Sequence, residues 1–432
     1  MDNTPLPVAE VIDVSPVWAG HRVLFCLHTV GDRQYVAFYD ADRWLTVGCR
    51  RLDHIRFQCV RLPKQTAWDS HNYVALNVDS QGRIHVSGDM HINPLVYFVS
   101  DNPHDIDSFR RLPGLVGRNE ERATYPQFLK GPEHEFIFTY RDGDAQDGEQ
   151  IFNLYDPESR QWTRFFEQPL LTGEGRRNAY YELPLLGPDG YYHLCWVWRD
   201  SYDASSNHDL SYARSRDLRR WETGAGQTIP LPIRMATGDI VDPVPVGGGI
   251  INGGIFLGFD SCNRVVLSYH KFDAKGNTQA YNARLEAGEW RIYRTSDWDY
   301  RWWFGGGGSL AKSDVILSPV EVEQGQLIQR FEHVRYGRGR WLLDEATLQP
   351  ISTEADTGPL AEHLMQVESK FPGMQVNVLA DTGQRPDGRR DYLRWETLDA
   401  NRDQPREGPL PEPSILRVVS VMSSLREDIA NS

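Results

Sequence analysis

A β-strand module that ends in a tryptophan recurs along this 432-residue chain. Its clearest copies end with the segments Asn153–Trp162, Tyr212–Trp221 and Tyr281–Trp290, and a weaker copy ends with Val334–Trp341. The intervals between these tryptophans are 59, 69 and 51 residues. Repeats of this length with about four short strands each are typical of a β-propeller, in which every blade buries its faces against its neighbours.

The chain length sets the expected number of modules. At roughly 60 residues per blade, the chain has room for about seven blades, within the usual range of about 4–8. Helical periodicity is scarce, and the strand-like segment Ser414–Val421 could pair with N-terminal strands and remove exposed sheet edges. The sequence therefore predicts an all-β fold, a seven-bladed β-propeller forming one domain over residues 1–432 and closed by its N- and C-terminal strands. A sandwich pair or an irregular β-solenoid remains the alternative.

The charge of the chain limits its partners. A formal net charge of -14 argues against a general binder of nucleic acid or anionic membranes, because these need a basic surface. An acidic sugar substrate stays open, since a few arginines in one cleft can hold a carboxylate. No apolar run approaches the ~20 residues that span a bilayer. The N-terminus MDNTPLPVAEV lacks the pattern of a signal peptide, which favours a cytoplasmic location, or a secreted or periplasmic one if this is a mature form.

Cysteine and aromatic content say less about function. The five cysteines lack CxxC or other ligand spacing, so we expect reduced strand residues rather than disulfides or a zinc cage. The 13 Trp, 19 Tyr and 17 Phe side chains could stack on sugars or fill β-sheet cores. Composition does not distinguish these two uses.

Two histidines flank a predicted hairpin in the stretch Asp69–Ser100. Apolar residues alternate with polar ones over residues 74–78, residues 80–82 (Ser-Gln-Gly) make a turn, and a second strand follows. His71 precedes the first strand and His91 follows the second, so both imidazoles should lie at one end of the hairpin. A lone histidine is more often structural than catalytic, but two at one edge, each close to an asparagine, favour a site.

The same argument applies to the next predicted hairpin, Ala123–Asp142. Tyr125 lies at its beginning and Arg141 at its end, so both should reach the face that carries the two histidines. Later hairpins end in further polar residues, which make Arg199 and two more histidines candidates for binding. An arginine at a strand end is ordinarily a salt-bridged surface group, and its recurrence at one edge is what favours function. The candidate substrate-binding residues are Asn72, Tyr181, Arg199, His208 and His270.

These residue types suit elimination from a uronic acid. A base must remove the weakly acidic C5 proton, an acid must protonate the departing C4 oxygen, and a cation must stabilise the charge that develops on the C6 carboxylate. Histidine can act as base or acid near neutral pH. A tyrosine can do so if neighbouring positive charge lowers its pKa. Arginine binds both carboxylate oxygens through its planar fork.

Several segments together resemble the BNR-repeat-containing family, which includes seven-bladed propeller polysaccharide lyases such as ulvan lyases and rhamnose–glucuronate lyases. The resemblance covers most of residues 65–405 and is carried by SHNYVALNVDSQGRIHVSGDMHINPLVYF, ATYPQFLKGPEHEFIFTYRDG, LSYARSRDLRRWE, GNTQAYNAR and YLRWETLDANRDQPR. It implies cleavage of a rhamnose-to-glucuronate 1,4 linkage by β-elimination in an acidic polysaccharide or oligosaccharide.

The resemblance also implies roles for individual residues. His91 is similar to the base or acid of these lyases, with His71 and Tyr125 supporting it or sharing proton transfer. Arg141 and Arg199 resemble carboxylate neutralisers. No cofactor is implied for the chemistry, while a structural metal ion with unknown ligands is possible. The polymer, endo or exo action, the choice of His or Tyr as base, and the oligomeric state stay open.

Two other functions remain as alternatives. A sialidase-like glycoside hydrolase would need a paired carboxylate or a Tyr–Glu pair with several arginines, and no carboxylate pair stands out. Residues Ser215, Asp217 and Trp221 form a degenerate Asp-box, the turn motif of such propellers, in which Arg219 replaces the expected glycine. A non-catalytic carbohydrate-binding propeller is the other alternative, because a fold does not dictate a function.

Overall fold

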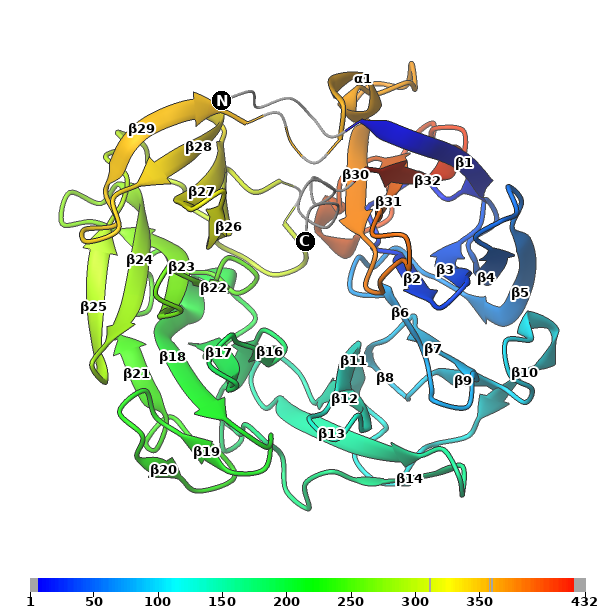
Figure 1. Ribbon diagram of the computed structural model, residues 1–432, viewed down its shortest axis with the longest axis horizontal. Coiled ribbons are helices and arrows are strands. Elements are labelled where there is room, and N and C mark those ends of the chain that lie inside the picture. Colours follow the sequence, from blue (N-terminus) through cyan, green and yellow to red (C-terminus); the bar gives the residue numbers. More distant parts are fainter. Residues whose placement is uncertain (1–6, 311, 357, 359, 423–432) are drawn as a thin grey trace, which may run out of the picture.

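The computed structural model describes residues 7–310, 312–356, 358 and 360–422. The regular secondary structure of this part of the chain is almost wholly β-strand, which confirms the all-β prediction. The strands form seven separate sheets. Figure 1 shows these sheets arranged around a common centre, in the order of the chain.

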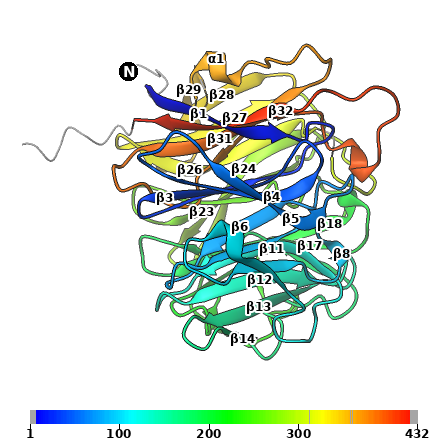
Figure 2. The ribbon, with the colours of Figure 1, turned by 90° about the vertical axis from the view of Figure 1, so that its right-hand side faces the viewer.

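The first three sheets come from the N-terminal part of the chain. The first contains β2 (Cys26–Val30), β3 (Arg33–Tyr39), β4 (Trp44–Arg51) and β5 (Gln58–Gln65). The second contains β6 (Val74–Val78), β7 (Ile84–Gly88), β9 (Tyr97–Ser100) and β10 (Phe109–Leu112). The third contains β8 (His91–Asn93), β11 (Ala123–Lys130), β12 (Phe136–Asp142), β13 (Glu149–Asp156) and β14 (Gln161–Arg164), and Figure 2 shows β11 to β14 side by side.

The next three sheets continue around the centre. The fourth contains β15 (Asn178–Tyr181), β16 (Leu185–Leu186), β17 (Tyr192–Arg199), β18 (Asn207–Ser215), β19 (Trp221–Glu222), β20 (Thr228–Ile229) and β21 (Asp239–Asp242). The fifth contains β22 (Phe256–Phe259), β23 (Val265–Phe272), β24 (Thr278–Glu286) and β25 (Glu289–Arg294). The sixth contains β26 (Val315–Glu323), β27 (Gln326–His333), β28 (Gly337–Leu343) and β29 (Pro350–Ala355).

The last sheet joins strands from both parts of the chain. It contains β30 (Gln375–Ala380), β31 (Arg390–Thr397), β32 (Ser414–Val421) and β1 (Val8–Val17). Strands β1 and β32 are antiparallel, with Val11 opposite Val419. The expected pairing of the C-terminal strand with an N-terminal strand is therefore present.

Helical structure in the described residues is limited to short pieces. The helix α1 covers Glu362–Met365. Single 3-10 turns cover Ile106–Ser108, Ala204–Ser206 and Asn401–Asp403. In the described part of the chain, no helix combines the length and apolar character needed to cross a membrane.

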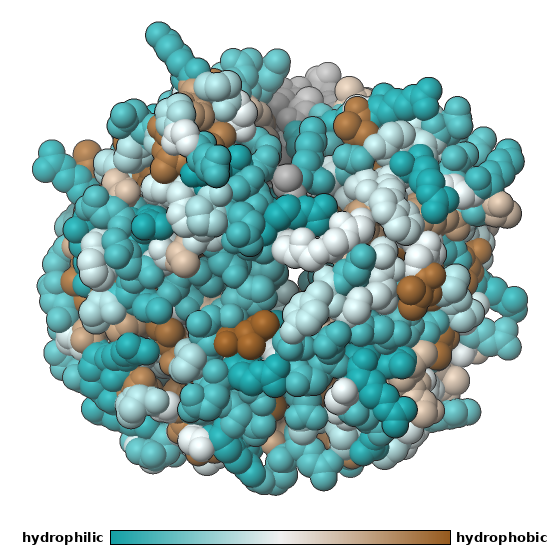
Figure 3. Space-filling view, turned by 180° about the vertical axis from the view of Figure 1, so that it is seen from behind, coloured by the Kyte–Doolittle hydropathy of each residue, from teal (hydrophilic) through white to brown (hydrophobic). Residues whose placement is uncertain are grey.

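The tryptophans of the repeated module pack between neighbouring sheets. Trp162 lies against Tyr97 of the preceding sheet, with ring centroids 5.6 Å apart. Trp290 meets Tyr212 of its preceding sheet at 4.9 Å. Burying such large apolar rings stabilises sheet-to-sheet contact, which explains why the tryptophan recurs at the end of the module. The face opposite to that of Figure 1 is mainly hydrophilic and has an opening near its centre (Figure 3).

One strand departs from the predicted hairpin arrangement. His91 follows the β6–β7 hairpin as expected, but it lies in β8, which pairs with β11 of the next sheet rather than with its own hairpin. Thr124 is opposite His91 in this pairing. The two histidine rings meet as expected, but His91 is held by the neighbouring sheet, to which the chain crosses at Asp89, a residue with a φ of +59°.

Candidate active site

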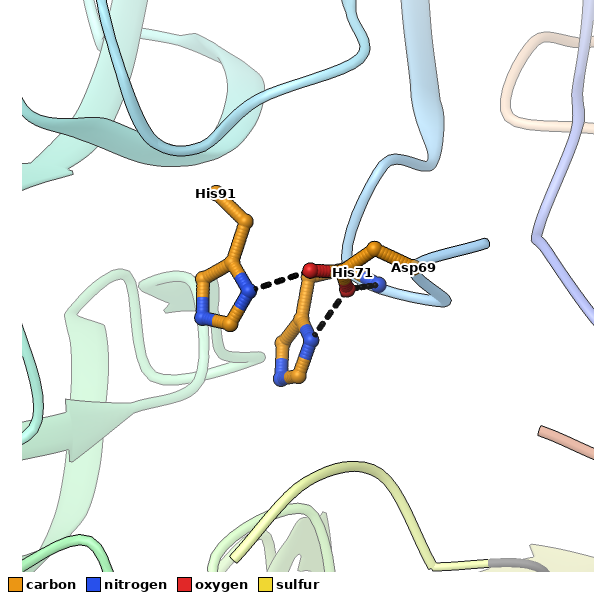
Figure 4. Close-up of side chains that lie close together, drawn as sticks. All are labelled: Asp69, His71 and His91. Carbon is orange, nitrogen blue, oxygen red and sulfur yellow. Dashed lines mark hydrogen bonds and ion pairs between the residues drawn. The ribbon is translucent and has the colours of Figure 1, made fainter. Parts of the chain in front are cut away.

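Asp69 holds two histidine rings side by side. Its Oδ1 lies 2.7 Å from Nδ1 of His71, and its Oδ2 lies 2.6 Å from Nδ1 of His91. The two imidazoles stack with centroids 3.9 Å apart and planes inclined by 23°. Figure 4 shows both Nε2 atoms pointing away from the carboxylate. Because each Nδ1 is held by Asp69, Nε2 is the nitrogen that each ring offers for proton transfer.

The backbone around the two histidines fixes this arrangement. Asp69 also accepts the N–H of His71 at 2.9 Å, which forms a local turn. The N–H of Asn72 donates to the carbonyl oxygen of Asp69 at 3.1 Å. On the other side, the pairing of β8 with β11 sets His91 opposite Thr124. Two adjacent sheets therefore supply one histidine position each.

The charges around His71 favour its protonated form. Its Nδ1 lies 3.4 Å from Oδ2 of Asp403 as well as close to Asp69. Burial alone would lower the pKa of His71, but the hydrogen bonds with Asp403 and Asp69 outweigh burial and raise this pKa to about 8. Burial opposes ionisation of Asp69, yet its hydrogen bonds with both histidines hold the pKa of the carboxyl far below its usual range.

Tyr125 lies between the histidines and two arginines. Its ring is 5.8 Å from that of His71, and the guanidinium carbon of Arg141 lies 4.8 Å from the ring centroid. The residue has a φ of +60° at a bulge in β11, an unusual conformation for a side chain with a Cβ. Its hydroxyl makes no hydrogen bond to any described residue. Burial raises the pKa of Tyr125, although Arg141 and Arg199 act against it.

Arg141 is a buried cation without an ionic partner. Only 1% of the residue is exposed. It donates to the carbonyl oxygen of Gly143 at 3.1 Å, to the hydroxyl of Tyr180 at 3.2 Å and to the hydroxyl of Thr124 at 3.2 Å. No carboxylate of the described chain forms an ion pair with it. Because an unpaired buried charge is costly, this guanidinium is suited to receive an anionic ligand.

Arg199 provides a second cation nearby. Its guanidinium carbon lies 5.3 Å from the ring centroid of Tyr180, the residue that also accepts from Arg141. It donates to the carbonyl oxygens of Ser201 and Tyr202. Among the described residues, no carboxylate forms an ion pair with Arg199 either. Arg141 thus adjoins the Tyr125 ring and Arg199 adjoins the Tyr180 ring, and neither has a neutralising partner among the described residues.

A pocket of about 180 Å³ opens next to Tyr125. Its walls are tyrosines, amides and one carboxylate, and it adjoins the histidine pair through Tyr125 itself. We call it the Glu182 pocket. Its lining residues are Tyr73, Tyr125, Gln127, Gln150, Asn178, Ala179, Tyr180, Tyr181, Glu182, Asn252 and Gly253.

Comparison with known families gives one match. A sequence model described as "BNR repeat-containing family member" matches residues 33–298, more than half of the chain. The chain belongs to the BNR repeat-containing family. None of the curated proteins matches it.

Solved structures share the fold of this BNR repeat-containing protein. The crystal structure of the polysaccharide lyase Uly1 has a TM-score of 0.63 at 14% identity, covering 96% of this chain and 99% of that one. An ulvan lyase of the polysaccharide lyase family PL25 has a TM-score of 0.60 at 11% identity, with 94% of both chains covered. The same type of ulvan lyase bound to -[GlcA(1-4)Rha3S]- also gives 0.60, at 10% identity and 94% coverage of both chains.

The four catalytic residues expected from the sequence come together in this BNR repeat-containing protein. Of the expected binding residues, some lie at the pocket and others do not. Tyr181 lines the Glu182 pocket, and Arg199 contacts Tyr180 of its lining. Asn72 lies next to the site, but it is buried and its amide donates to the hydroxyl of Thr66 at 3.2 Å, so it is engaged within the protein.

Two expected binding residues lie away from the pocket lining. Both ring nitrogens of His208 are engaged, with Asp200 at 3.1 Å and Asp209 at 2.8 Å. His270 is buried, and Nδ1 bonds to the carbonyl oxygen of Gly249 at 2.9 Å, while burial lowers its pKa to about 4. Neither histidine belongs to the pocket lining, because a hairpin end can also turn a side chain into the protein interior.

Sequence reasoning missed several residues of the site. Asp69 had a usable signal, since an aspartate two residues before a histidine can bond to its ring. Asp403 had no signal in the sequence, because its contact with His71 joins distant parts of the chain. Asn178 and Glu182 also escaped notice, as only folding shows that both line the same pocket.

Two groups of side chains in the described residues could in principle hold a metal ion. In the first, formed by Asp69, His71 and His91, the carboxylate oxygens are already bonded to ring nitrogens. In the second, formed by Asp260, Cys262 and Glu345, the carboxylate of Asp260 lies 2.7 Å from Nε of Arg264. In both groups a carboxylate already serves another partner, so neither group is assigned as a metal site. A structural metal ion stays a prediction.

Replacing Asp69 with asparagine should lower the pKa of His71. The carboxylate charge raises this pKa, and removing a close opposite charge typically shifts a pKa by about one unit or more. NMR titration of the His71 ring measures the change, and Asp53→Asn, at an exposed carboxylate elsewhere, is the control. An unchanged His71 pKa in Asp69→Asn would contradict this account.

The same variant should show a matching change in stability. Since the folded-state pKa of His71 is raised, its contribution to the free energy of unfolding is full below about pH 6.5 and is lost as the pH rises through about 8. The contribution is about 2 kcal/mol at most. Urea unfolding from pH 6 to 9 should therefore give a smaller fall in stability for Asp69→Asn than for the unchanged protein.

Proposed function

We propose that this protein is a polysaccharide lyase that cleaves a rhamnose-(1,4)-glucuronate linkage by β-elimination. The observation that carries the proposal is the buried guanidinium of Arg141, which has no ionic partner among the described residues and lies against Tyr125 beside the stacked histidines. A uronate carboxylate would supply the missing negative charge. The shared fold with Uly1 and the ulvan lyase supports the same reaction class.

The proposed reaction needs three roles. Arg141 and Arg199 bind the C6 carboxylate and stabilise the charge that develops there when C5 loses its proton. Nε2 of His91 takes this proton, the C4–C5 double bond forms, and the C4–O bond breaks. His71 and Tyr125 are the groups that can return a proton to the departing oxygen, because both hold one near neutral pH. The scheme requires no cofactor.

The proposal also covers the fold of the protein and its binding partner. We infer that the seven sheets are the blades of one propeller domain over residues 1–432, supported by their arrangement around a common centre (Figure 1). The partner is an acidic polysaccharide or oligosaccharide.

A glycoside hydrolase is the second candidate. One observation favours it: Glu182 lines the same pocket as Tyr125, and burial raises the pKa of this carboxyl to about 7, a value that suits a general acid. Asp69 does not provide the second carboxylate, because both of its oxygens bind imidazoles.

Incubation with ulvan and with gum arabic separates the candidates. We expect rising ultraviolet absorbance, since elimination leaves a double bond conjugated with the uronate carboxylate. New reducing ends without absorbance would instead show a hydrolase. Binding without either product would show a carbohydrate-binding protein and would contradict the proposal.

A further inference from the structure

The Glu182 pocket combines one acid with two nearby cations. Arg141 donates to Tyr180 at 3.2 Å and Arg199 donates to Asn252 at 3.4 Å, so two lining residues are backed by cations. Glu182 supplies the only carboxylate of the lining, and no Arg, Lys or His lines the pocket directly. A ligand in the pocket therefore meets one carboxylate directly, and the two cations lie behind other residues of the lining.

The Glu182 carboxylate has no partner within the described protein. Its backbone N–H donates to the carbonyl oxygen of Cys195 at 3.1 Å, which fixes the residue at the end of β15. No hydrogen bond or ion pair reaches its side chain from any described residue. Burial raises its pKa to about 7. A half-buried acceptor without a donor is costly, and a ligand hydroxyl would remove that cost.

Asn178 provides a complementary donor in the same pocket. Its side chain is fully buried, and Oδ1 accepts from Nε2 of Gln150 at 3.3 Å. Its Nδ2 has no hydrogen-bond partner in the described structure. The pocket therefore offers an unused acceptor and an unused donor. A sugar hydroxyl satisfies both kinds of group, because it donates one hydrogen bond and accepts others.

The size and walls of the pocket fit one sugar unit. Its volume of about 180 Å³ lies below the range of roughly 300–1,000 Å³ for drug-sized ligands. Four tyrosines contribute rings to the wall, and Tyr125 belongs both to this pocket and to the proposed reaction centre. The occupant is thus a sugar directly linked to the uronate that the arginines bind.

We propose that the Glu182 pocket binds the neutral sugar next to the uronate and selects against a sulfate ester on this sugar. Glu182 accepts hydrogen bonds from the free hydroxyls of the sugar, and Asn178 donates hydrogen bonds to them. The selection follows from charge and hydrogen bonding. A sulfate offers only acceptors and carries a negative charge, so an ionised Glu182 would repel it and gain no hydrogen bond. This inference rests on the proposed function and adds the substrate class. By contrast, the similar ulvan lyase is bound to a sulfated ligand, -[GlcA(1-4)Rha3S]-.

Matched oligosaccharides test the selection. Rhamnose–glucuronate oligosaccharides with and without the rhamnose sulfate are compared at pH 8, where Glu182 is mainly ionised. We expect kcat/KM to be at least roughly tenfold higher for the unsulfated form. Glu182→Gln removes the charge and keeps the shape, so it should reduce this ratio at least about fivefold. Glu133→Gln, at an exposed glutamate, should leave the ratio unchanged.

Calorimetric binding separates failure of the subsite from failure of the lyase reaction. Binding of both oligosaccharides is measured to His91→Ala and to His91→Ala combined with Glu182→Gln. Selective binding that Glu182→Gln weakens would support the subsite even if the unchanged protein released no unsaturated product. Equal binding and equal turnover of the two oligosaccharides would overturn the subsite. A preference for the unsulfated form that survives Glu182→Gln would overturn the role of Glu182.

Discussion

Arg141→Gln should reduce kcat/KM for elimination by about 10²–10³-fold. Glutamine keeps a hydrogen-bond donor but removes the buried positive charge that stabilises the developing charge on the uronate. Most of the loss should fall on kcat, since this charge grows only in the transition state. Initial rates from the absorbance of the unsaturated product measure the effect.

Two further variants make the Arg141 result interpretable. Arg141→Lys keeps the charge and loses the planar fork, so its activity should lie between those of Arg141→Gln and the unchanged protein. Arg220→Gln, at a side chain that is 89% exposed, should behave as the unchanged protein. Thermal unfolding shows whether each variant is folded. A folded Arg141→Gln protein with activity within a few fold of normal would refute the assigned role.

His91→Ala should lower kcat by about 10²–10⁴-fold. The variant removes the ring nitrogen that takes the C5 proton, while the melting temperature should change little because 27% of the side chain is exposed. Asp69 keeps its contact with His71 in this variant. Stopped reactions with product absorbance give kcat, and a thermal scan gives stability.

The control for this histidine is His54→Ala, at a side chain that is 66% exposed. It should leave both kcat and the melting temperature unchanged. A large fall in melting temperature for His91→Ala, together with residual activity near normal, would make His91 a structural residue instead.

The sequence predicted the local parts of the site better than the long-range ones. Alternating polarity and a glycine turn gave the β6–β7 hairpin, and hairpin geometry gave the meeting of His71 and His91. Their shared carboxylate needed the fold, because Asp69 reaches both rings only after β8 has crossed to the next sheet. The second carboxylate beside His71 belongs to Asp403, which lies between β31 and β32 of the last sheet. Its contact with His71 therefore forms only when distant parts of the chain meet.

Burial is what sequence reasoning could not evaluate. A tyrosine with a lowered pKa was one expectation for Tyr125, since arginines stand near it. In the folded protein desolvation exceeds their effect, so the pKa of the phenol is raised. Burial was also unknown for His270, which the sequence analysis expected to bind substrate. The His270 side chain lies in the protein interior.

Tyr125 owes its position to the main chain. Its left-handed backbone conformation, just before Pro126 and at the bulge of β11, sets the phenol against Arg141 before any sugar arrives. Since no described hydrogen bond anchors the hydroxyl, exchanging the residue for phenylalanine would delete one oxygen atom and leave the ring where it is. The backbone therefore sets the position of the Tyr125 ring independently of its hydroxyl. The role of the hydroxyl oxygen can be tested by removing that one atom.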